Sequence, residues 1–158
     1  MARHYGRAKK GKRANDYVPG ARFERTSAIS TIRLNGKQAP MMFKGTLAGA
    51  AFGAYTKEVL APTLGKGDIV VLGNYASHKV EGALKPIYER GATVLFLPPY
   101  SPGYNPIELS WSKMKPELRR MKAKAYDELV EGMKTALDNI SVSDISGWFK
   151  HCKYSINK

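Results

Sequence analysis

Glu108 is the carboxylate of this sequence whose surroundings best suit metal chemistry. It follows the loop 98–106, in which four prolines each fix φ and stiffen the backbone. Asn105 is expected to cap the helix that follows, with Pro106 at its favoured first position. Such a rigid support can hold a carboxylate with the accuracy that a divalent cation requires. The alternative is that Glu108 only complements the positive end of the helix dipole.

Other residues that commonly carry chemistry are few. The single cysteine, Cys152, excludes an internal disulfide and a multi-cysteine metal site, and we interpret it as a packed or half-exposed thiol. His78 is a candidate donor to a phosphate group. A hydrogen-bonded structural role is the equally weighted alternative for this histidine.

Positive charge dominates the chain. Twenty-six Lys and Arg against 13 Asp and Glu give a net charge of +13 and a pI near 9.9. This balance favours a polyanionic partner, most commonly nucleic acid, over the alternative of solubility alone. Clustering favours a phosphate-binding track. The candidate DNA-binding residues are Arg3, Arg7, Lys9, Lys10, Lys12 and Arg13 near the N-terminus, and Lys113, Lys115, Arg119 and Lys122 on a predicted helix.

The second basic cluster has helical periodicity. Lys115, Arg119 and Lys122 are expected to share one face of the helix with Glu108, because they recur at spacings of three or four. The alternative is an ordinary solvated helix face. No run of 18 apolar residues is present, and no apolar segment follows the basic N-terminus. We therefore expect no transmembrane helix, no signal peptide and a cytoplasmic location.

The first part of the chain predicts an irregular segment, a hairpin and a helix. Residues 1–20 are basic and rich in glycine. Asn35-Gly36 predicts a turn between strands at 23–34 and 39–43, since both turn positions tolerate positive φ. Apolar periodicity then predicts a helix over 47–64.

The second part alternates strands and helices. Two short apolar runs, 68–72 and 93–97, have the pattern of strands buried on both faces. Between them, 77–90 predicts a helix capped by Ser77. Pro116 should kink the helix that begins at Ile107, or end its first segment. Two closing helices are expected over 126–137 and 143–149. The alternation predicts a single α/β domain over residues 1–158, with a parallel portion.

A longer motif gives a family resemblance. Residues 97–108 read LPPYSPGYNPIE, which resembles a hallmark of mariner-like bacterial insertion-sequence transposases: Leu-Pro-Pro-Tyr-Ser-Pro-x-x-Asn-Pro-Ile-Glu, then a Trp and a basic helix. The same family has an Asp-Asn-x-x-x-His-Lys segment at the end of a strand. The other matching residues are Asn74, Ser77, His78, Lys79, Trp111, Lys113 and Lys115, with further likeness at 3–8 and 147–152.

This resemblance implies a DDE-type catalytic domain with a ribonuclease H-like fold, in which helices surround a mixed sheet. Such enzymes carry out DNA transposition, a form of DNA recombination and integration, by two-metal phosphoryl transfer with Mg²⁺ or Mn²⁺. Three acidic residues hold the ions, because carboxylate oxygens suit these hard cations. One lies on the first strand, one at the end of the fourth and one on a later helix. Glu108 matches the third, and His78 and Lys79 are implied DNA contacts.

The sequence departs from this pattern at two points. Gly73 stands at the position of the family's second aspartate, 35 positions before Glu108, and this spacing is found in one branch of the family. The first aspartate lies on a strand that should precede Arg3, so we expect a truncated domain that lacks its first strand. One carboxylate cannot hold two ions. The chain is therefore expected to bind Mg²⁺ or Mn²⁺ poorly and to be catalytically inactive.

The interpretation is an inactive DDE-type transposase domain of a bacterial mobile element. The expected partners are DNA, bound weakly and in a salt-sensitive way, and a homo-oligomer or a mixed oligomer with intact transposase. A nucleoid-associated location is expected, with no membrane and no small-molecule substrate. The alternative is a non-catalytic DNA-binding or regulatory interaction module derived from a transposase. A third possibility is a pseudogene product without a selected role.

Overall fold

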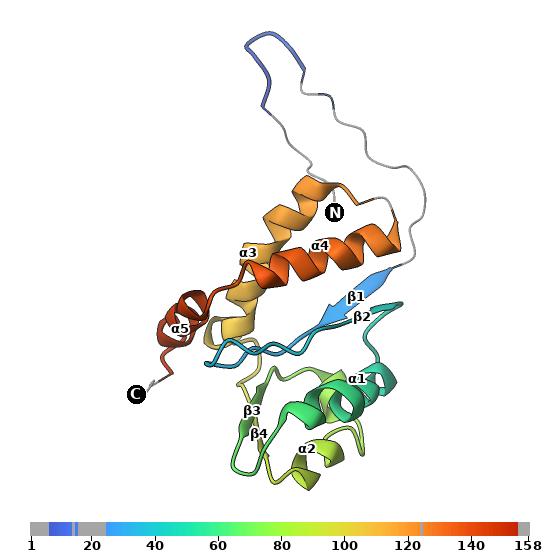
Figure 1. Cartoon of the computed structure of the whole chain (residues 1–158), viewed down its shortest axis with the longest axis vertical. Coiled ribbons are helices and arrows are strands. Elements are labelled where there is room, and N and C mark those ends of the chain that lie inside the picture. Colours follow the sequence, from blue (N-terminus) through green and yellow to red (C-terminus); the bar gives the residue numbers. More distant parts are fainter. Residues whose placement is uncertain (1–6, 14, 16–24, 124, 155–158) are drawn as a thin grey trace.

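The computed structural model describes residues 7–13, 15, 25–123 and 125–154 (Figure 1). The strands among them form two two-stranded sheets, β1 with β2 and β3 with β4. The architecture is mixed α/β as predicted, but these strands do not join one mixed sheet. Within the described ranges, no helix has the length and apolar character needed to cross a membrane.

The elements are β1 (Thr26–Ile29), β2 (Met41–Lys44), α1 (Gly49–Tyr55), η1 (Thr56–Leu60), η2 (Ala61–Thr63), β3 (Ile69–Leu72), η3 (Ala76–Lys79), α2 (Lys85–Glu89), β4 (Thr93–Phe96), η4 (Pro102–Tyr104), α3 (Pro106–Met121), α4 (Tyr126–Asp138) and α5 (Val142–His151).

The predicted hairpin is present, with a turn of a different kind. β1 and β2 pair antiparallel, and a three-residue loop is closed by the hydrogen bond from the Arg33 N–H to the Lys37 carbonyl (3.0 Å). Within this loop only Gly36 has a positive φ, of 87°. The geometry is therefore a type I turn followed by a left-handed glycine, and Asn35 does not take a positive φ.

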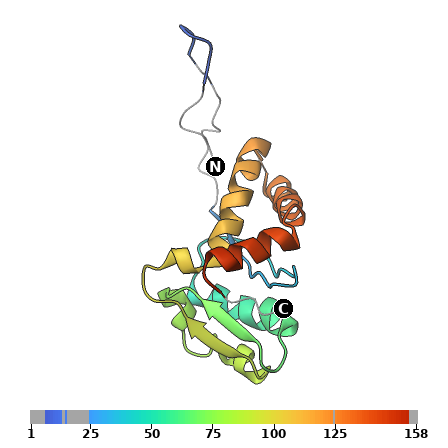
Figure 2. The same ribbon diagram turned by 90° about the vertical axis from the view of Figure 1, so that its left-hand side faces the viewer.

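The hairpin lies between two hydrophobic cores (Figures 1 and 2). Successive residues of a strand point to opposite faces. Ile29 and Met41 pack against the first core, whereas Ala28 and Met42 pack against the second. The first core consists of Phe52, Tyr55, Leu60, Val70, Leu72, Ala83, Ile87 and Ala92, and the second of Met114, Leu118, Met133, Ala136, Leu137, Ile140 and Ile145.

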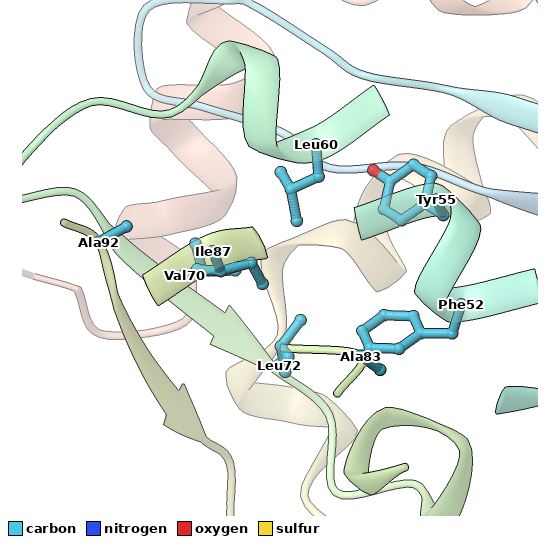
Figure 3. Packing of buried hydrophobic residues seen from close by; sticks show 8 residues of the cluster. All are labelled: Phe52, Tyr55, Leu60, Val70, Leu72, Ala83, Ile87 and Ala92. Atoms are coloured by element: carbon cyan, nitrogen blue, oxygen red, sulfur yellow. The ribbon is translucent and has the colours of Figure 1, made fainter. Parts of the chain in front are cut away.

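The helix expected over 47–64 is present over 49–63, but its geometry changes along its length. An α-helical part leads into a π-helical turn and a short 3₁₀ turn. Phe52 and Tyr55 project from the α-helical part into the first core (Figure 3). The Tyr55 hydroxyl donates to the Ala39 carbonyl at 2.7 Å, which ties this helix to the hairpin. Burial raises the pKa of Tyr55 to about 12.

Both apolar runs form strands, and they pair in parallel. The expectation that they are buried on both faces is wrong. Val70 and Leu72 are buried in the first core, but Ile69 has an exposed fraction of 63% and Leu95 is also exposed. A two-stranded sheet has little width, and in the described structure only its core-facing side is well covered.

The helix expected over 77–90 is also largely wrong. A 3₁₀ turn occupies 76–79, and α2 begins only at Lys85. Gly82 separates the two with a φ of 75°, a conformation outside the helical region. Pro86 lies in the first turn of α2, where its missing N–H leaves no helical hydrogen bond unmade. Ser77 caps neither element.

α3 begins as predicted. The Asn105 side chain accepts a hydrogen bond from the Ile107 N–H at 3.4 Å, and Pro106 takes the first helical position. Pro116 does not end the helix, which continues to Met121. The proline leaves the Ser112 carbonyl without its helical donor. Ser112 and Pro116 are both exposed, so water can hydrogen-bond that carbonyl.

The two closing helices are confirmed as α4 and α5. Ser141 and Asp144 form a capping box at the start of α5, with the Ser141 hydroxyl accepting from the Asp144 N–H at 3.1 Å. The Asp144 carboxylate also pairs with Lys113 of α3 at 2.6 Å. Cys152 is buried, which is one of the two environments expected for it, and burial raises the pKa of its thiol.

Replacing Asp144 with asparagine is expected to weaken the acid dependence of stability. The hydrogen bond from Lys113, followed by those from Ser141, lowers the pKa of Asp144 from 3.8 to about 2. Because the pKa is lower in the folded state, the ionised carboxylate stabilises the fold at pH values above its unfolded-state pKa. This contribution is lost as pH falls from about 5 to about 2. Urea denaturation at neutral and acidic pH should therefore show a smaller loss of stability for Asp144→Asn. An equal loss in both proteins would contradict this role.

Candidate functional site

A cavity of about 470 Å³ runs along β3, from Asp68 to Gly73, and reaches the start of α3. Its wall includes Gly73, which directly follows β3, and the start of α3 at 105–107. Residues 29–35 of the hairpin and Phe149 and Tyr154 near the C-terminus complete much of the remaining wall. The structure therefore brings Gly73 and the residues that immediately precede Glu108 to one site, although they are far apart in the sequence.

His78 supports the Gly73 end of this cavity. Its Nδ1 lies 2.7 Å from the Gly73 carbonyl oxygen. A carbonyl only accepts, so Nδ1 must carry a proton and donate it to this oxygen. The imidazole also packs on the Phe52 ring, with 4.5 Å between ring centroids. This geometry agrees with the structural alternative for His78.

Tyr75 fills the space beside Gly73. A Cβ placed on Gly73 would lie 3.1 Å from Cε2 and 3.2 Å from Cδ2 of the Tyr75 ring. These distances are short for carbon atoms, whose optimal separation is about 3.5–4.0 Å. Any side chain at position 73 thus requires Tyr75 to move, which is feasible because Tyr75 is largely exposed.

Glu108 is half-buried in the first turn of α3. Within residues 7–13, 15, 25–123 and 125–154, its carboxylate has no hydrogen-bond or ion-pair partner. The same described residues contain no group of three or more His, Cys, Asp or Glu side chains suited to a metal ion. Glu108 therefore offers a carboxylate, but within the described residues it does not belong to a group of three such ligands.

Asp68 lines the same cavity at its other end and is engaged by neighbouring residues. It lies at the opposite end of β3 from Gly73, accepts from the Gly65 N–H at 2.8 Å and pairs with Arg33 of the hairpin. The hydrogen bond from Gly65, followed by that from Arg33, lowers the pKa of Asp68. Arg33 also donates to the Thr63 carbonyl at 2.7 Å. Asp68 thus joins the hairpin to the β3–β4 sheet.

The predicted basic residues fall into different environments. Lys115, Arg119 and Lys122 are exposed along the side of α3 predicted to carry Glu108. Lys113 is instead held in its ion pair with Asp144. Lys79 lies over the Phe96 ring, with Nζ 5.6 Å from the centroid. Arg3 lies outside the described residues, and the remaining N-terminal candidates are exposed: Arg7, Lys9, Lys10, Lys12 and Arg13.

Three residues of this region were not expected from the sequence. Arg33 links two parts of the fold, Tyr75 covers Gly73, and Tyr100 is fully exposed in the proline-rich loop. The only signal for Tyr100 was its position between prolines in an otherwise stiff segment. Nothing in the local pattern distinguished Arg33 or Tyr75, because their roles depend on contacts with distant residues.

Comparison with known proteins identifies one family. The DDE superfamily endonuclease family matches residues 1–130, a range that contains the cavity-lining ends of β3 and α3 and the whole motif at 97–108. The match ends within α4 and so does not extend to the similarity noted at 147–152. A search of curated proteins found no match.

Proposed function

We propose, because the chain belongs to the DDE superfamily endonuclease family, that it is a transposase domain of the mariner-like insertion-sequence type with a ribonuclease H-like fold. The observation that carries the proposal is the shared cavity. Gly73, at the position of the family's second acidic residue, lines it together with residues 105–107, which directly precede Glu108, the position of the third. A parallel β3–β4 pair beside this cavity is consistent with the proposed fold.

The residues present do not fit a two-metal site. Divalent cations of this type need several hard oxygen ligands. Glu108 supplies one carboxylate, Gly73 supplies no side chain, and Asp68 is held by Arg33 at the other end of β3. Tyr75 also occupies the space that a side chain at position 73 would use. We therefore propose that this chain binds DNA without cutting it.

The surface of α3 supports DNA binding. Lys115 and Arg119 are exposed on the helix that starts at the cavity. Their charges can neutralise DNA phosphates, and the counterions released make such binding depend strongly on salt. The excess of positive charge over the whole chain, +13, adds long-range attraction toward a polyanion. This arrangement also fits a non-catalytic DNA-binding module derived from a transposase.

The free edge of β3 supports the proposed oligomers. β3 pairs with β4 on one side, and within the described residues no strand pairs with its other edge. An unpaired strand edge can accept a strand from another chain. A second copy, or an intact transposase in a mixed oligomer, is the proposed source of that strand.

The proposal predicts duplex binding without nicking. Labelled duplex DNA should bind with an affinity that falls steeply as salt rises, and incubation with Mg²⁺ or Mn²⁺ should leave both strands intact. The matched control is Glu108→Gln, which removes the carboxylate at nearly constant size. Both proteins should give the same background on a denaturing gel. Metal-dependent nicking by the natural chain that Glu108→Gln abolishes would contradict the absence of cleavage.

A further inference from the structure

Three exposed aromatic residues lie at or shortly after the carboxyl ends of β3 and β4. Tyr75 follows β3 by three residues, Phe96 ends β4, and Tyr100 follows in the proline-rich loop. Their exposed fractions are 63%, 39% and 102%. The carboxyl ends of paired parallel strands lie at the same edge of a sheet. Tyr75 and Phe96 therefore belong to one edge of the sheet, and Tyr100 follows Phe96 by four residues. We term these three residues the aromatic edge.

Tyr100 is the most informative member of the aromatic edge. Its φ is 54°, in the left-handed region that residues other than glycine seldom adopt. Prolines at 98, 99 and 102 restrict the backbone around it. The ring has no intramolecular cover to compensate for the unfavourable backbone conformation. Residues held in such conformations cluster at functional sites.

Positive charge accompanies the rings. Lys79 places Nζ 5.6 Å from the centroid of Phe96. Tyr75 packs edge to face against His78, with ring centroids 5.5 Å apart. The side chains of His78 and Lys79 therefore contact aromatic residues near the ends of both strands, Tyr75 after β3 and Phe96 in β4. Flat apolar faces beside a cation suit a ligand that has both a planar ring and a negative charge.

We propose that the aromatic edge binds unpaired nucleobases, with Tyr100 as the principal stacking residue. This inference rests on the proposed DNA-binding function and adds a ligand class to it: single-stranded DNA or bases displaced from a duplex. Stacking on an aromatic side chain is possible for every base, because each has a flat π face, and it does not require a particular sequence. Lys79 contributes attraction toward the adjacent phosphate.

The test compares two single strands that differ only in their bases. One is labelled oligothymidine of about 12 nucleotides, within the size of typical single-strand sites, and the other is an abasic strand of equal length and charge. Fluorescence anisotropy should show that the natural chain binds oligothymidine roughly tenfold more tightly than the abasic strand. Tyr100→Ala should remove most of this difference, whereas Tyr100→Phe should retain it because stacking does not need the hydroxyl.

Tyr88→Ala is the matched control. Tyr88 is 53% exposed on α2, which leads into the amino end of β4, so it lies away from the aromatic edge. This variant should leave both affinities unchanged. Equal binding of the two strands by the natural chain, or an unchanged preference in Tyr100→Ala, would overturn the aromatic edge as a base-binding site. Duplex binding is measured in parallel. If duplex DNA binds but the base preference is absent, only the aromatic edge is contradicted, whereas absence of duplex binding as well would contradict the proposed DNA-binding function.

Discussion

Replacing Phe52 with alanine is expected to lower the free energy of unfolding by about 3–5 kcal/mol. Phe52 is 1% exposed and belongs to the first core, where its ring lies beside Ala83 (Figure 3). The substitution removes a large apolar side chain and leaves a cavity between the helix and β3. Equilibrium urea denaturation measures the change. Because a small domain commonly has only about 5–15 kcal/mol of stability, the variant should be close to the folding limit.

Phe52→Ala should also disturb the proposed site. The ring supports the imidazole of His78, which in turn holds the Gly73 carbonyl. The His78 ring protons should therefore change chemical shift in any folded fraction. Phe52→Leu retains much of the volume but not the aromatic face, so it should cost less stability and still change those shifts. A loss in Phe52→Ala no larger than that in the exposed-site variant Tyr88→Ala would contradict the described packing.

The double variant Lys115→Ala/Arg119→Ala is expected to weaken duplex binding by roughly 30-fold at about 0.15 M salt. Each side chain is proposed to neutralise one phosphate. Each lost phosphate contact reduces the slope of log affinity against log salt by about 0.9, so the slope should fall by about 2. Both positions are exposed on α3, and removal of their side chains should change stability little. Anisotropy titrations at several salt concentrations measure both quantities.

The control for this variant has the same net charge as Lys115→Ala/Arg119→Ala. Lys57 and Lys85 are largely exposed, on η1 and α2, and neither belongs to the α3 face. Lys57→Ala/Lys85→Ala also removes two positive charges. If position matters, this control should retain most of the affinity. An equal loss in the two double variants would show that net charge alone attracts DNA, and α3 would lose its proposed role.

Local chemistry predicted several boundaries well. Asn35-Gly36 marked the hairpin because glycine accepts the left-handed conformation that the turn requires. Asn105 and Pro106 marked the start of α3 because an amide cap and a proline suit the first helical turn. Both signals act within a few residues, so the rest of the fold does not alter them.

Features that depend on distant contacts could not be predicted in the same way. The apolar run at 69–72 resembles a strand buried on both faces, yet Ile69 is exposed because burial depends on which elements cover the sheet. For the candidate site, the motif located Glu108 and Gly73. It gave no indication that the Tyr75 ring covers Gly73 or that Arg33 engages Asp68. These contacts form only after segments distant in sequence come together.

The position of the hairpin between two cores has a consequence for strand register. In most hairpins one face is polar, and a slip of one residue is costly because it exposes apolar side chains. Here each face contributes apolar side chains to a core, Ile29 and Met41 on one and Ala28 and Met42 on the other, so the sequence pattern discriminates less strongly between neighbouring registers. The turn must therefore fix the alignment. Gly36 fixes the turn because it adopts the left-handed conformation that the turn requires. No other residue fits there easily, since a Cβ on Gly36 would lie only 2.8 Å from Cγ2 of Val142.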